Sequence, residues 1–111
     1  MKWATVVTPN GPAAHFRVIY SELVRTSLRD LFAQARQAGN FAEVVTAVRT
    51  IHGRLQTQPL VFGEPQATYQ HLGLQGRQGA VRPLMVYYAV DEQRRRVYVL
   101  VPLLLLPAGG S

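Results

Sequence analysis

The sequence contains no cysteine. Disulfide bonds and thiolate metal sites are therefore excluded, which agrees with a cytoplasmic location. Residues 1–8 lack a charged region followed by a long apolar region, so we expect no signal peptide. The longest apolar run, Val97–Leu106, is interrupted by Pro102 and has about half the length that a membrane-spanning helix needs. We expect a protein that does not enter the membrane.

Lysine and acidic residues are both scarce. Lys2 is the only lysine, yet the chain has 12 basic and 6 acidic residues and a net charge of +6. Arginine binds phosphate and carboxylate groups in bidentate geometry and stacks on bases, so this balance favours nucleic acid, an acidic protein or anionic lipid as partner. A GC-rich genome that favours arginine codons is a second explanation, and it requires no function.

Length and composition indicate one domain. The chain has 111 residues, of which 48% are hydrophobic and 16% charged, enough for a single core. We expect an N-terminal extension over residues 1–14, an α+β domain over residues 15–106 and a tail over residues 107–111.

Two amphipathic helices are predicted in the first half of the chain. Ser21 is a residue type preferred at a helix N-cap, and Gly39 is a residue type preferred just after the C-terminus of a helix. Asn40, with Glu43 three residues later, resembles a capping box for a second helix that ends before Pro59. The apolar residues at helical spacing are Val24, Leu28, Leu31, Phe32 and Ala35, then Phe41, Val44, Val48, Ile51 and Leu55. The short junction between the helices predicts an antiparallel hairpin.

Strands are predicted on both sides of the helices. Residues 15–20 alternate in polarity, and residues 84–90 and 95–101 flank a polar turn, which predicts an antiparallel hairpin. Residues 3–8 also have strand composition. Residues 68–74 form a weaker candidate, and the glycines that end and follow it (Gly73, Gly76 and Gly79) predict a loose or bulged stretch.

This order of elements resembles the RelE/ParE superfamily of bacterial toxins. The resemblance rests on Phe16–Ser21, Pro59–Gly63, Met85–Glu92 and Val97–Val101. It implies an α+β fold with an N-terminal strand, an antiparallel helix hairpin and a three-stranded antiparallel run that completes one sheet. It also implies an antitoxin as partner and one of two targets, since RelE-like toxins cleave messenger RNA on the ribosome and ParE-like toxins inhibit DNA gyrase.

Catalytic residues can be carried over only in part. The cleaving members use basic side chains, often with a tyrosine, and neither a metal nor another cofactor. Arg77 is the match in the second strand, and Arg82 lies two residues before Leu84, where the family has a basic residue. The C-terminal basic and proton-transferring positions fall on leucines. The resemblance therefore implies weakened or absent nuclease activity, with an active ribonuclease that uses Arg77 and Arg82 as the alternative.

Two surfaces are candidates for binding. Arg17, Arg77 and Arg82 would form a basic face of the sheet that contacts nucleic acid or another target. Tyr87 and Tyr88 point to opposite faces, so one belongs to the core while the other packs or stacks on a base; Tyr88 is taken as the target-binding candidate. The other surface consists of Leu103, Leu104, Leu105 and Leu106, a charge-free edge that would bind the antitoxin or a second copy in a non-toxic dimeric module.

A metal site is not expected. His15, His52 and His71 fall on separate predicted elements and have no spacing typical of metal ligands.

Overall fold

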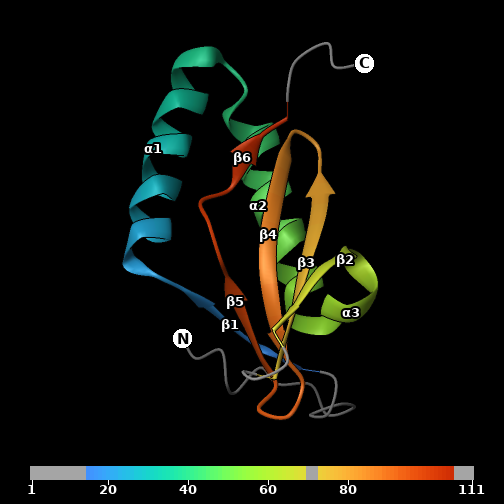
Figure 1. Cartoon of the computed structure of the whole chain (residues 1–111). Coiled ribbons are helices and arrows are strands. Elements are labelled where there is room, and N and C mark those ends of the chain that lie inside the picture. Colours follow the sequence, from blue (N-terminus) through green and yellow to red (C-terminus); the bar gives the residue numbers. More distant parts are fainter. Residues whose placement is uncertain (1–14, 70–72, 107–111) are drawn as a thin grey trace.

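The computed structural model describes residues 15–69 and 73–106 (Figure 1). Its elements are β1 (Arg17–Tyr20), α1 (Glu22–Ala38), α2 (Phe41–Thr57), α3 (Pro59–Phe62), β2 (Glu64–Tyr69), β3 (Leu74–Val81), β4 (Leu84–Asp91), β5 (Arg96–Val99) and β6 (Leu104–Leu105). The predicted α+β fold is confirmed: an N-terminal strand and two long helices precede a run of antiparallel strands. The expected N-terminal extension (residues 1–14), which includes the strand-like residues 3–8, and the expected tail (residues 107–111) lie outside the described residues.

The two long helices form where their caps predict them. The Ser21 hydroxyl accepts a hydrogen bond from the Val24 N–H at 3.2 Å, and Gly39 ends α1 with a φ of 85°. Asn40 does not form the expected capping box, because its side chain makes no capping hydrogen bond. Instead its backbone N–H donates to the Ala35 carbonyl at 3.0 Å, which closes the end of α1. The junction is thus organised by α1.

The strands form one mixed sheet in the order β1-β5-β4-β3-β2, and β6 pairs with β4. β1 runs parallel to β5, with Val18 opposite Val97, and the remaining neighbours are antiparallel. The first described strand therefore lies beside one from the far end of the chain. The helices lie between them in sequence, as a crossover between parallel strands requires.

The segment before β4 differs from the prediction. The candidate strand at residues 68–74 corresponds to the end of β2 and the start of β3. The glycine-rich stretch after it is a continuous strand, and the irregularity of this ladder lies in β2, between Pro65 and Ala67, opposite Arg77 and Gly76. Gly79 shows why glycine is present there: a Cβ at this position would lie 2.5 Å from the Phe62 ring. At this position glycine permits close packing of α3 on the sheet and does not loosen the strand.

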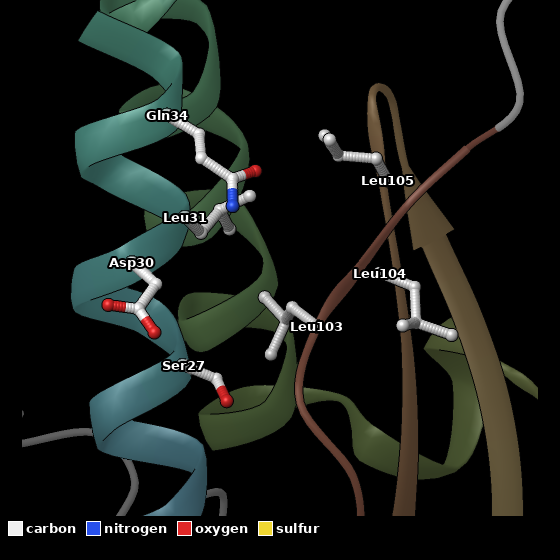
Figure 2. A pocket seen from close by; sticks show the side chains of 7 residues that line it. All are labelled: Ser27, Asp30, Leu31, Gln34, Leu103, Leu104 and Leu105. Atoms are coloured by element: carbon white, nitrogen blue, oxygen red, sulfur yellow. The ribbon is translucent and has the colours of Figure 1, made fainter.

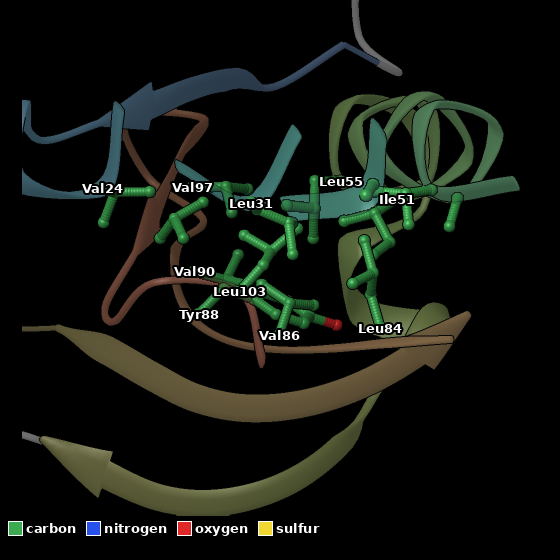
Figure 3. Close-up of a cluster of buried hydrophobic side chains, with 14 residues drawn as sticks. Val24, Leu31, Ile51, Leu55, Leu84, Val86, Tyr88, Val90, Val97 and Leu103 are labelled. Atoms are coloured by element: carbon green, nitrogen blue, oxygen red, sulfur yellow. The ribbon is translucent and has the colours of Figure 1, made fainter. Parts of the chain in front are cut away.

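The core lies between the helices and one face of the sheet (Figure 3). Alternate residues of β4 and β5 point into it: Leu84, Val86, Tyr88, Val90, Val97 and Val99. They meet Val24, Leu31, Ala35, Val44, Ala47, Ile51, Leu55 and Leu103. No helix of the described chain is long and apolar enough to cross a membrane.

Candidate binding surface on the open face of the sheet

The sheet face away from the core is covered by no helix of the described residues. Side chains alternate between the faces of a strand, so β4 directs to this face the residues between its core positions. The strand register extends the same face across the sheet. We call it the open face; its members are Arg17, Ile19, Glu64, Gly76, Gln78, Ala80, Met85, Tyr87, Ala89, Asp91, Arg96 and Tyr98.

An apolar band runs across the open face. Leu100, which follows β5, and Leu104 of β6 extend it. The Leu100 N–H donates to the Tyr87 carbonyl at 2.9 Å, which places Leu100 opposite Tyr87, and Leu104 lies opposite Met85. These two leucines are 45% and 43% exposed, respectively. The apolar band consists of Ile19, Tyr87, Tyr98, Met85, Leu100 and Leu104. Such a contiguous surface is typical of an interaction site.

A basic pair lies at one end of this band. Arg17 of β1 is directly opposite Arg96 of β5 in the parallel ladder. On the other side of Arg96, Asp91 is its partner in β4. The Asp91 carboxylate accepts hydrogen bonds from the Arg94 backbone N–H at 3.1 Å and from its Nη1 at 3.0 Å. The single carboxylate of Asp91, which also bonds Arg94, offsets the charge of Arg17 and Arg96 only in part, so the Arg17–Arg96 pair retains positive charge that can attract an anionic group.

The electrostatics of Asp91 follow from the same contacts. The hydrogen bond from the Arg94 backbone lowers the pKa of the Asp91 carboxyl, and the Arg94 guanidinium and the charge of Arg96 act in the same direction. Asp91 is therefore held as a carboxylate at the turn between β4 and β5, where it orders the arginine-rich segment.

Arg77 and Tyr88, both predicted site residues, lie on the covered face. Arg77 is only 8% exposed and lies opposite Tyr88 in the ladder. Its guanidinium donates to the Gly63 carbonyl and to Gln75 Oε1. The Tyr88 hydroxyl donates to the Pro59 carbonyl at 2.7 Å and accepts from the Gly63 N–H at 2.9 Å. Burial raises the pKa of Tyr88, although Arg77 and the Gly63 N–H oppose this. Both side chains hold α3 and Gly63 against the sheet.

The expected basic face formed by Arg17, Arg77 and Arg82 is not present. Arg17 is exposed on the open face, Arg77 is on the opposite face, and Arg82 is exposed in the turn between β3 and β4. That turn lies at the start of β4. Arg17 lies at the other end, because it is opposite Arg96, which is opposite Asp91, the last residue of β4. Arg17 and Arg82 are thus separated by the length of β4, about 25 Å for eight residues.

Arg96, Tyr98 and Tyr87 are the surface residues that the sequence prediction missed. The alternation in β5 could have placed Arg96 and Tyr98 on one face, because Val97 and Val99 clearly belong to the core. For the tyrosine pair, the core residue is Tyr88 and the residue on the open face is Tyr87. The pairing of Arg96 with Arg17 carries no local sequence signal, because it joins distant parts of the chain.

The predicted leucine interface is divided by the structure. Leu103 is buried in the core, whereas Leu104 and Leu105 are 43% and 49% exposed, and Leu106 is half-buried. Only the strand residues after Leu103 thus present apolar surface to a partner.

No group of three potential metal ligands occurs within residues 15–69 and 73–106. His52 forms a hydrogen bond with Tyr20, in which the Tyr20 hydroxyl lies 2.7 Å from the His52 Nδ1. His71 lies outside the described residues. No protein family matches the chain, and neither does a curated protein or a solved structure.

Proposed function

We propose that this protein is a RelE/ParE-like toxin-fold protein that acts by binding through its open face, with weakened or absent nuclease activity. The order of elements, with an N-terminal strand, two helices and antiparallel strands in one mixed sheet, supports the proposal. The observation that carries it is the apolar band beside the Arg17–Arg96 pair, left without a helical cover in the described structure.

The open face favours binding over cleavage. General acid–base catalysis needs its groups within hydrogen-bond reach of one phosphate and its 2′-hydroxyl. Arg77 is engaged by Gly63 and Gln75 on the covered face, and Arg82 is a strand length away from Arg17. The alternative, a ribonuclease that uses Arg77 and Arg82, would require Arg77 to leave its buried contacts.

The surface also defines the chemistry of the partner. An amphipathic segment could lay an apolar stripe on the band and place a carboxylate against Arg17 and Arg96, which is the complementarity that directs specific association. The cognate antitoxin, a cytoplasmic protein, is the partner we propose. We propose DNA gyrase as the target, since ParE-like toxins act on it without cleaving RNA, and the ribosome with its messenger RNA is the alternative.

The proposal is tested by inducing the protein in a bacterial host. We expect growth arrest with intact messenger RNA and an SOS response. Arg17→Glu should restore growth, because it reverses the charge beside the apolar band. Arg49→Glu on α2, also exposed, makes the same change in net charge away from the open face and should leave the arrest unchanged.

Other outcomes would contradict the proposal. Cleaved messenger RNA in arrested cells, lost on Arg82→Ala, would establish the ribonuclease alternative. Unaffected growth, together with a concentration-dependent dimer in light scattering, would assign the exposed leucines to a non-toxic dimeric module.

A further inference from the structure

A second surface lies between α1 and β6, on a different part of the molecule from the Arg17–Arg96 pair. It is a pocket of about 320 Å³, near the small end of the range for ligand sites. We call it the edge groove; its lining residues are Ser27, Asp30, Leu31, Gln34, Leu103, Leu104 and Leu105. Figure 2 shows Leu103 and Leu105 pointing toward α1, while Leu104 points away from it.

The edge groove borders a free strand edge. The Leu106 N–H donates to the Pro83 carbonyl at 2.7 Å. In an antiparallel ladder, residue pairs that form backbone hydrogen bonds alternate with pairs that do not. Leu106 belongs to a bonded pair, so its neighbour Leu105 belongs to a non-bonded pair and directs its N–H and C=O away from β4. β1 pairs with β5 and ends at Tyr20, and no strand of the described chain lies beside β6 on that side. The backbone of Leu105 is therefore available to a further strand.

The register explains why this edge stays free. β5 and β6 both pair with β4, but the register of β6 is shifted by two residues relative to that of β5. The two additional residues lie between Leu100 and Leu104, where Pro102 lacks the N–H that a continuous ladder needs. β6 is thus a separate short strand, while the chain after β1 turns away into α1.

The charge of the groove is opposite to that of the protein. Asp30 is the one charged residue among those that line it, in a chain with a net charge of +6. Asp30 is exposed, and within the described structure no basic side chain forms an ion pair with it. A basic group is therefore the complement that this site lacks.

We propose that the edge groove binds an extended segment of a partner protein, which adds as a strand to β6 and places a basic side chain against Asp30. Strand addition takes its affinity from backbone hydrogen bonds and its specificity from alternate side chains, which here are one apolar residue over Leu103 and Leu105 and one basic residue. A second copy of this chain fits less well, because two strands of two residues bury far less than the roughly 800 Å² per partner of a stable interface. The proposal does not depend on the open face.

The experiment uses a fluorescent hexapeptide of alternating valine and threonine in which one valine is replaced by arginine, so that the arginine and the remaining valines share the strand face that meets Asp30, Leu103 and Leu105. We expect saturable binding in fluorescence anisotropy, weakened about tenfold when the peptide carries glutamate in place of arginine. Asp30→Asn should weaken binding of the arginine peptide about fivefold by the same reasoning. Glu22→Gln, on the same helix but outside the groove, loses the same charge and should bind as the wild type does.

A backbone control identifies strand addition. N-methylation of the peptide on the edge that pairs with β6 should abolish binding, while methylation of the other edge should not. Arg17→Glu should leave peptide binding unchanged, which separates this site from the open face. The proposal is overturned if neither edge is sensitive, if the glutamate peptide binds equally well, or if the protein forms a dimer that excludes the peptide.

Discussion

At the scale of single residues, the buried polar cluster around Gly63 is tightly constrained. Arg77 and Tyr88 bind the carbonyl and the N–H of Gly63 from the strands. The Arg77 Nε is buried without a hydrogen-bond partner in the described structure, so the cluster is incompletely satisfied. Burying a guanidinium is costly unless it forms hydrogen bonds. The Gln75 side-chain oxygen and the Gly63 backbone carbonyl oxygen accept these bonds from Arg77.

Gly63→Ala should destabilise the protein. A Cβ at Gly63 would lie 2.6 Å from both the Gln78 carbonyl oxygen and the Tyr88 hydroxyl, so backbone and a bonded side chain would have to move. We expect the free energy of unfolding to fall by about 1–3 kcal/mol in urea denaturation. Gly53→Ala is the matched control: its Cβ meets no atom within 4 Å in α2, so it should stabilise the helix by up to about 1 kcal/mol. Equal effects of the two substitutions would contradict this account.

At the scale of secondary-structure elements, the parallel pairing of β1 with β5 creates a local conflict. Arg17 and Arg96 are directly opposite, and like charges in that position destabilise a sheet. A binding surface explains this arrangement, because an anionic group from a partner would neutralise both charges. The same pair that weakens the isolated protein would then strengthen its complex.

Arg17→Glu should therefore raise stability while it removes function. We expect a gain of up to about 1 kcal/mol in the free energy of unfolding at low salt, because the substitution turns a repulsive cross-strand pair into an attractive one. Added salt should reduce this gain, because it screens both the repulsion in the wild type and the attraction in the variant. Arg49→Glu on α2 has no cross-strand partner and serves as the control in the same urea titration. A loss of stability on Arg17→Glu would show that the two arginines do not repel each other in the native protein.

The turn between β4 and β5 should respond to acid through Asp91. Since the folded-state pKa of Asp91 lies below its ordinary value of 3.8, its stabilising effect is complete above that pH and is lost as the pH falls through the folded-state pKa. Asp91→Asn should destabilise the protein at pH 6, and its difference from the wild type should shrink toward pH 2. Urea titrations at several pH values measure this difference. A difference that stays constant over the whole range would rule out the carboxylate as its cause.

At the scale of the whole molecule, the sequence predicted the elements better than their arrangement. Ser21 and Gly39 mark the ends of α1 because capping is local chemistry, and the β4–β5 hairpin follows from local alternation. The parallel pairing of β1 with β5 could not be predicted from any short stretch of sequence, since the two strands lie at opposite ends of the described chain.

The candidate surface was less predictable for the same reason. Whether an arginine faces solvent or the core depends on strand register, so Arg77 and Arg17, both in strands, lie on opposite faces. Only Arg17 of the predicted target-binding residues belongs to the open face. The tyrosine pair shows the limit clearly: the sequence establishes that Tyr87 and Tyr88 diverge, and only the packing of α3 against Tyr88 decides which one is outside.

The place of β1 also has a consequence for synthesis on the ribosome. β1 is made first among the described elements, but its neighbour β5 emerges only after both long helices and three further strands. Until then Val18 and Tyr20 have no strand beside them, and the core that they share with Val97 and Val99 is incomplete. Contacts between distant parts of a chain form slowly, so this domain should acquire its native structure only after β5 has left the ribosome. A nascent chain halted before β5 would expose the apolar faces of its helices to chaperones and proteases.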